Sequence, residues 1–150
     1  MAKMNSKFKY MYDAAPSIAL AANDGVALTA DTNLTAYALD QLNGYWNTEG
    51  ELADQTFAVV INVEGLDLTT GDETYVFSLQ FGDAVGFGGG TVITHRLVAT
   101  AAGQQLAALV DIDTVKAMLD DATHMRLQLD VSGTTPSITF KAFIAGAIIR

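Results

Sequence analysis

Three stretches of this chain alternate apolar and polar side chains with a period of two, and this pattern constrains the fold more than any other feature. The stretches cover residues 56–64, 73–81 and 124–131. In each stretch every second residue is apolar: Phe57, Val59, Ile61 and Val63 in the first; Tyr75, Phe77, Leu79 and Phe81 in the second; and Met125, Leu127, Leu129 and Val131 in the third. Successive side chains point to opposite faces of a strand, so each stretch is predicted to be a strand with one buried face.

Less regular patterns predict further strands in the rest of the chain. These strands cover residues 17–22, 26–30, 91–100, 104–112 and 137–149. In the stretch 91–100, one parity holds Val92, Thr94, Arg96 and Val98, and the other holds Ile93, His95 and Leu97. The runs 56–64 and 73–81 flank the turn sequence Thr70-Gly71-Asp72, which predicts that they form a hairpin.

The chain has one good helix pattern, near residues 113–122. Asp113 suits its N-cap, while Val115, Met118 and Leu119 have helical spacing. Many short strands, Gly-, Asn- and Asp-containing turns and one short helix indicate an all-β fold, an antiparallel β-sandwich that is jelly-roll-like. A closed barrel is the alternative. The length of 150 residues suits one domain over residues 16–150 after an N-terminal arm, residues 1–15. The absence of cysteine excludes a disulfide framework.

The arm differs from the rest of the chain in charge. Residues 1–12 hold three lysines and no acid, so the net charge of −9 leaves −12 on the remainder. Phosphate backbones repel such an acidic body, so we expect no nucleic-acid partner. The aromatic side chains of the arm are costly to leave in water, so we expect the arm to dock on a partner protein or a neighbouring copy. The residues predicted for this contact are Lys3, Lys7, Phe8, Lys9, Tyr10 and Tyr12.

The arm is not followed by the continuous apolar segment of a signal peptide, and no apolar run is long enough to span a bilayer. Hydrophobic residues nevertheless make up 50% of the chain and charged residues only 17%. This balance predicts apolar surface that is hidden in a partner or in a second copy.

Three places are candidates for such contacts. Beyond about Phe143 both parities of the last strand are apolar, which predicts self-association through Phe143, Ile144, Ile148 and Ile149. Trp46 stands beside Tyr45 in a polar loop, where it either recognises a partner or folds back over the edge of the core. Phe87 lies in the glycine-rich loop 82–90, which is either a flexible tip that inserts into a partner or a long hairpin loop.

The sequence shows no constellation that carries catalysis. His95 and His124 stand alone on alternating strands, so a zinc site is not supported, and no serine has a nucleophile motif. The glycine run 86–90 lacks the Lys-Ser/Thr ending and the following helix of a phosphate-binding loop. The acids of residues 49–54 are either a loose calcium site or solvated loop acids. We therefore expect a protein that is not an enzyme and that uses no cofactor.

The order of these features also carries a resemblance. An Ala/Thr-rich start at residues 18–34 precedes the strand Phe57–Val63, a polar turn, and the strand Tyr75–Gln80. The strand His124–Leu129, the turn 132–136 and a final strand from Ser137 follow. Over residues 17–150 this pattern resembles the small jelly-roll cement, or decoration, proteins of tailed-phage capsids. The arm and the loop of Tyr45 and Trp46 fall outside the pattern.

The resemblance implies a structural protein that is made in the host cytoplasm and then binds the outer surface of an assembled capsid. Its partners would be the major capsid protein and further copies of itself, and it would reinforce the shell. One alternative is a carbohydrate-binding β-sandwich of a phage tail or fibre, with Tyr45, Trp46 and Phe87 stacking on sugar rings. Another is a cupin-like enzyme, but two widely separated histidines do not provide the metal cluster that cupins need.

Overall fold

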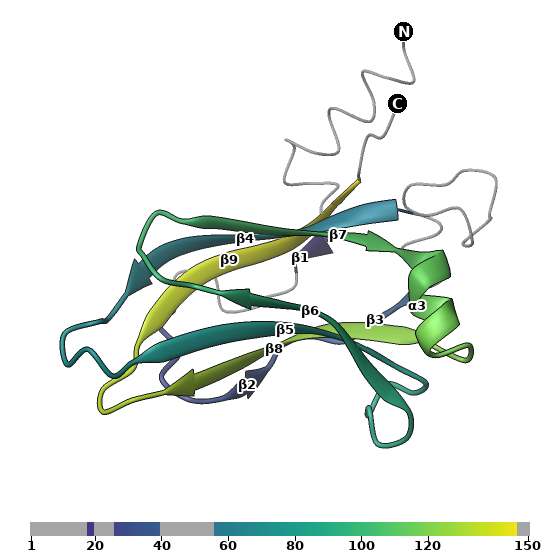
Figure 1. Ribbon diagram of the computed structural model, residues 1–150, viewed down its shortest axis with the longest axis horizontal. Coiled ribbons are helices and arrows are strands. Elements are labelled where there is room, and N and C mark those ends of the chain that lie inside the picture. The colour runs from purple at the N-terminus through teal and green to yellow at the C-terminus, as the bar shows by residue number, and fades with distance from the viewer. Residues whose placement is uncertain (1–17, 20–25, 40–55, 147–150) are drawn as a thin grey trace, which may run out of the picture.

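The computed structural model describes residues 18–19, 26–39 and 56–146, which form a sandwich of two antiparallel sheets (Figure 1). One sheet has the strand order β1-β9-β4-β7; the other has the order β2-β8-β5-β6, and β3 also pairs with β8. The strands are β1 (Ile18–Ala19), β2 (Thr32–Asn33), β3 (Tyr37–Ala38), β4 (Thr56–Leu66), β5 (Thr74–Gly82), β6 (Thr91–Val98), β7 (Gln105–Asp111), β8 (His124–Ser132) and β9 (Ile138–Gly146). A short helix, α3 (Ile112–Met118), follows β7.

The strand pairing is that of a jelly roll. If β2 and β3 are counted as one interrupted strand, the first strand pairs with the last, the second with the last but one, β4 with β7 and β5 with β6. The same nested pairing arises when the whole chain is folded into one long antiparallel hairpin whose turn lies between β5 and β6. The additional pairs β4–β9 and β5–β8 roll that hairpin into two packed sheets. The predicted all-β, jelly-roll-like sandwich is therefore confirmed.

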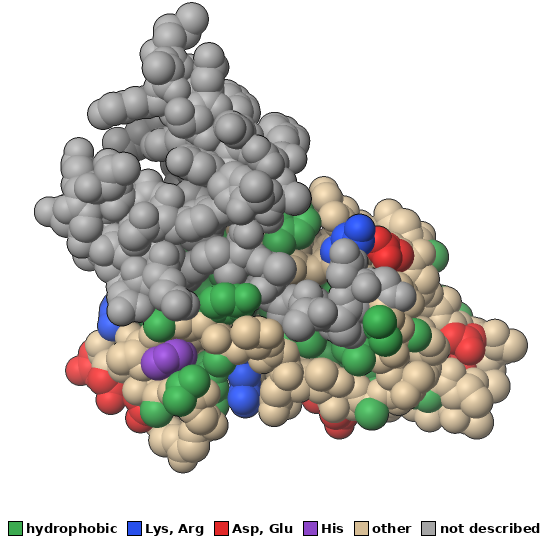
Figure 2. Space-filling view, turned by 180° about the vertical axis from the view of Figure 1, so that it is seen from behind, with side chains coloured by type: hydrophobic (Ala, Val, Ile, Leu, Met, Phe, Trp, Pro, Cys, Tyr) green, Lys and Arg blue, Asp and Glu red, His purple; other side chains and the backbone are tan. Residues whose placement is uncertain are grey.

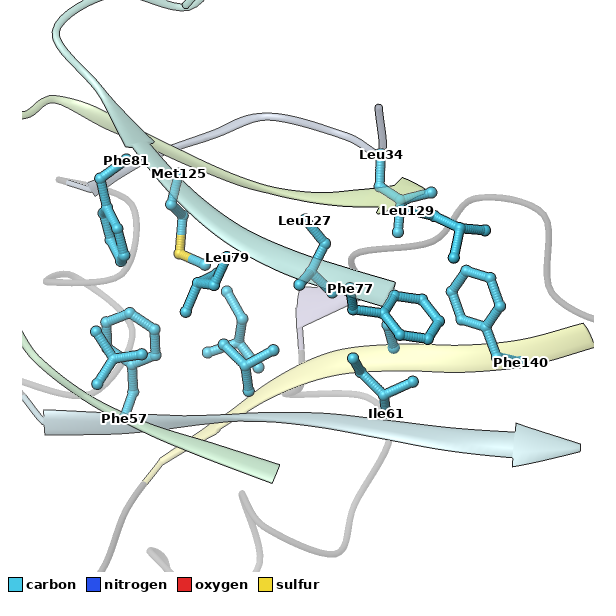
Figure 3. Close-up of a cluster of buried hydrophobic side chains, with 14 of the residues drawn as sticks. Leu34, Phe57, Ile61, Phe77, Leu79, Phe81, Met125, Leu127, Leu129 and Phe140 are labelled. Atoms are coloured by element: carbon cyan, nitrogen blue, oxygen red, sulfur yellow. The ribbon is translucent and has the colours of Figure 1, made fainter. Parts of the chain in front are cut away.

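The core lies between the sheets and is built from the predicted inward faces (Figure 3). The alternating apolar residues of β4 and β5 are all buried, as are Met125, Leu127 and Leu129 of β8. The rings of Phe77 on β5 and Phe140 on β9 meet edge to face across the sandwich, with their centroids 4.8 Å apart. Facing aromatic and aliphatic side chains of this kind supply most of the burial that stabilises a sandwich.

The predicted hairpin between residues 56–64 and 73–81 is wrong, because β4 and β5 belong to different sheets. Both strands have one strongly apolar face, and these faces pack against each other across the core instead of lying side by side. Residues 67–73 therefore carry the chain from one sheet to the other, and Gly71 takes a positive φ of 78° in that connection.

The hydroxyl of Tyr75 ties the two sheets together at this crossing. The pairing of β4 with β9 ends at Leu66 and Ile138, and beyond it the Asp67 N–H donates to the Ser137 carbonyl over 2.9 Å. The reciprocal hydrogen bond passes through Tyr75: the Ser137 N–H donates to the hydroxyl over 2.9 Å, and the hydroxyl donates to the Asp67 carbonyl over 2.7 Å. A side chain of one sheet thus completes the hydrogen-bond ladder of the other.

Two predictions about β6 and the early strands are also corrected. The register of β6 shifts opposite Leu79 and Gln80, where Thr94 is the extra residue, so Val92 lies on the same face as His95 and Leu97. The strand predicted over residues 26–30 is reduced to one isolated bridge, between Leu28 and Ile138.

The helix begins and ends earlier than predicted. Its N-cap is Asp111, whose carboxylate accepts a hydrogen bond from the Asp113 N–H over 3.0 Å, so Asp113 lies in the first turn. Val115 points into the core, whereas Met118 is exposed. The last residues of the predicted span, 119–122, lie outside the helix.

Candidate interaction surface

The outer face of the β1-β9-β4-β7 sheet is divided into an apolar half and a polar half. Strand register places Leu109 beside Ala58, and Val60 between Ala107 and Phe143. We call these five residues the apolar half-face. The next row along the strands is polar, because the Gln105 side chain donates to Asn62 Oδ1 over 2.8 Å. Lys141 and Glu64 form an ion pair of 3.5 Å beyond it.

The apolar half-face presents accessible hydrophobic surface that the sandwich core does not need. Leu109 is 58% exposed and Ala107 is exposed, while Ala58, Val60 and Phe143 are half-buried. The three small side chains leave this part of the sheet flat, and a flat apolar sheet surface favours contact with another protein surface. Other exposed hydrophobic side chains belong to separate elements. Figure 2 shows hydrophobic side chains in several separate groups on the face that it views.

The segments that carry most of the predicted contact residues attach around this half-face. The arm leads into β1, where Ile18 pairs with Ile144 of β9. The loop that contains Trp46 leads into β4, where Phe57 pairs with Gly146, and the C-terminal residues follow Gly146 directly. The three attachment points therefore lie at one end of one sheet. The residues Lys3, Lys7, Phe8, Lys9, Tyr10, Tyr12, Trp46, Ile148 and Ile149 lie outside the described residues, and their roles stay predictions.

The structure separates the two described residues of the predicted self-association set. Phe143 lies on the outer face, but Ile144 has no exposed surface and points into the core from β9, opposite Val59 of β4. Placing Ile144 on an association surface was therefore wrong, because the inward alternation of β9 continues through it. Ala107 and Leu109 were not among the predicted contact residues, although Leu106 and Val110 of the same strand already supply its inward face.

Phe87 is not an exposed tip, so the expectation that its ring projects from the glycine-rich loop is corrected. The side chain is 8% exposed and packs over Gly82, where an added Cβ would stand 2.7 Å from Phe87 Cδ1. The guanidinium of Arg126 lies 4.1 Å from the ring centroid. The loop itself is closed by Asp83 Oδ2, which accepts from the Gly90 N–H over 2.8 Å. The exposed hydrophobic residue of this loop is Val85.

Each of the two histidines has a neighbouring threonine as its hydrogen-bond partner. His95 Nδ1 lies 3.0 Å from the Thr94 hydroxyl, and His124 Nδ1 lies 2.8 Å from that of Thr123. Within the ranges that the structure describes, no three His, Cys, Asp or Glu side chains come close enough to hold a metal ion. The candidate calcium loop, residues 49–54, lies outside those ranges.

Three acids at the β4–β5 crossing have lowered pKa values because hydroxyl and amide groups donate to their carboxylates. Hydrogen bonds from Thr69 lower the pKa of Asp67. The pKa of Asp72 is lowered by Thr134 and then by Thr70, and Thr70 also lowers the pKa of Glu73. Each of these donors lies in the crossing or in the loop after β8, so the charged carboxylates are stabilised by hydrogen bonds within this corner of the fold.

Comparison of the chain with protein-family models, with curated proteins and with solved structures finds no match. None of the helices in the described ranges has the length and apolar character needed to cross a membrane.

Proposed function

We propose that this protein is a structural decoration protein that binds the outer surface of an assembled phage capsid and reinforces it. One observation carries the proposal. The arm, the Trp46 loop and the C-terminal residues, which the sequence marks for protein contacts, all attach beside the apolar half-face of a jelly roll. The apolar half-face and the attachment points of these three segments thus lie at the same end of one sheet.

The charge distribution supports a protein partner. The arm carries +3 over residues 1–12, and the remainder of the chain is strongly acidic. A basic aromatic arm binds acidic protein surface, while the acidic body repels packaged nucleic acid. Weak contacts suffice on a shell, because many copies and several contacts on each copy add through avidity.

Self-association is part of the proposal. The exposed Leu109 and the half-buried Phe143 flank a flat row of small residues, which suits face-to-face contact between two copies. Burial of such surface is favourable by about 25 cal/mol per Å² of apolar area. The carbohydrate-binding alternative has less support, because Phe87, one of its three aromatic rings, is buried beneath Arg126.

The direct test is co-sedimentation of the purified protein with empty shells, assembled from the major capsid protein of the genome that encodes it. We expect saturable binding to assembled shells and little binding to unassembled capsid subunits. Leu109→Lys places a charge in the apolar half-face without disturbing the core, because the wild-type side chain is already exposed. This variant should lose shell binding and any self-association seen by sedimentation velocity.

Val98→Lys is the matched control. Val98 is also an exposed, outward-facing residue of an edge strand, but it lies on the other sheet. It should bind shells as the wild type does. Failure of the wild type to bind assembled shells, or equal loss of binding in both variants, would contradict the proposal.

A further inference from the structure

The outer face of the other sheet holds a partly buried arginine, Arg126. Arg126 lies on β8, where its guanidinium rests on the Phe87 ring and its Nε donates to Gln80 Oε1 over 2.8 Å. Among the described residues, no carboxylate lies within ion-pair distance of Arg126. Burial also lowers its pKa from the ordinary value, which reflects a cation that is partly removed from water.

A relay of side-chain amides fixes the polarity of this site. Because Gln80 Oε1 accepts from Arg126, its Nε2 becomes the donor, and it donates to Gln128 Oε1 over 2.6 Å. Gln128 then keeps its own NH₂ group for an outside acceptor. Gln80 is 7% exposed, so the relay is held in place by the sheet. Both ends of the relay, the Nη groups of Arg126 and the NH₂ group of Gln128, therefore offer hydrogen-bond donors outward.

The surroundings of the relay leave this donor set uncompensated. Ser78 lies between Gln128 and Arg96 in strand register, and its buried hydroxyl has no hydrogen-bond partner within the described ranges. Asp83 Oδ2 accepts from the Gly90 N–H, while its Oδ1 is buried and has no hydrogen-bond partner within the described ranges. Neither Asp83 nor Asp130, which lies on the same face of β8, forms an ion pair with Arg126. A half-buried cation beside outward-facing donors gains stability from an anion that accepts from both ends.

We infer that Arg126 and Gln128 form a binding site for a carboxylate group. The guanidinium fork matches the two oxygens of a carboxylate. Phosphate, which carries more charge, fits less well, because the site offers one full positive charge on a protein of net charge −9. The site does not depend on shell binding through the apolar half-face, since the two lie on opposite outer faces of the sandwich.

The test uses acetate as the probe and nuclear magnetic resonance of the full-length protein as the readout. Acetate replaces chloride at constant ionic strength, while the Arg126 Nε–Hε and Gln128 side-chain NH₂ signals are followed. We expect both signals to shift together along one saturable curve. Arg126→Lys keeps the charge but removes the fork, so its apparent affinity for acetate should fall roughly tenfold or more. Arg96→Gln is the matched control, because Arg96 lies exposed on the same sheet face, and it should leave the curve unchanged.

A second variant keeps the inference testable if Arg126→Lys does not fold. Gln128→Glu keeps an oxygen that accepts from Gln80 Nε2, and it supplies a carboxylate beside Arg126, so it should fold normally and abolish the acetate shifts. A parallel titration with inorganic phosphate distinguishes the two anions. The inference is overturned if the shifts are unsaturable, if they persist in Gln128→Glu, or if phosphate binds roughly tenfold more tightly than acetate.

Discussion

Replacement of Tyr75 by Phe isolates the hydrogen bonds that join the two sheets at the β4–β5 crossing. The ring is fully buried, and the substitution removes only the hydroxyl, which accepts from the Ser137 N–H and donates to the Asp67 carbonyl. A hydrogen bond contributes about 0.5–1.5 kcal/mol net. The loss of two such bonds should therefore lower the free energy of unfolding by about 1–3 kcal/mol.

Urea denaturation of both proteins at neutral pH measures this change. For a domain of this size the dependence on urea is about 1–3 kcal/mol per M, so the midpoint should fall by about 1 M, with an unchanged slope. Amide hydrogen exchange supplies the local readout. The Ser137 amide should exchange faster in Tyr75→Phe than the change in global stability explains, because its acceptor is gone.

Phe77→Leu is the control for this experiment. Phe77 lies on the same strand and the same buried face, but its loss leaves a cavity and no unpaired backbone group. In Phe77→Leu, the exchange rates of the protected amides of both sheets should rise together, by the factor that the loss of global stability explains. A change below about 0.5 kcal/mol in Tyr75→Phe, with normal exchange at Ser137, would refute the bridging role of the hydroxyl.

Two further predictions concern the glycine-rich loop and the acid response. Gly82→Ala should destabilise the protein by about 1–3 kcal/mol in the same urea assay, because the new Cβ would stand 2.7 Å from Phe87 Cδ1, and a wild-type midpoint would contradict the packing. The folded-state pKa of Asp72 is lowered from 3.8, so its stabilisation is present above that pH and is lost as pH falls through the lowered value. The melting temperature of Asp72→Asn should therefore lie furthest below that of the wild type near neutrality and converge with it in acid, and a constant difference would disagree.

Alternation in the sequence predicted which residues point into the core but not which strands are neighbours. The inward parities of residues 56–64, 73–81 and 124–131 were correct, because a half-buried strand must separate apolar from polar side chains. The hairpin predicted between the first two was wrong. Two strands that each have one strongly apolar face can lie side by side in one sheet or face each other from two packed sheets, and alternation does not distinguish these arrangements. The bulge at Thr94 was hidden for a similar reason, because an inserted residue changes parity without an unusual sequence.

The candidate surface was predicted only in part. Phe143 lies on the outer face of its sheet, and its role in self-association stays a prediction, while Ile144 belongs to the core. Leu109 was missed because its exposure depends on β7 lying at the edge of the sheet, which no local pattern specifies. The ring of Phe87 is buried because Gly82 leaves room for it and Arg126 covers it, and these contacts join residues far apart in the sequence.

The nested pairing of the strands sets the order in which this chain can fold during synthesis. Ile18 needs Ile144 as its partner, and β4 needs both β7 and β9. The hairpin of β5 and β6 can close early, but the sheet that contains β1 stays incomplete until the last strand has left the ribosome. Contacts of such long sequence separation make folding slow, in the range of milliseconds to seconds. The emerging chain must therefore keep the apolar face of β4 apart from other chains until β9 arrives.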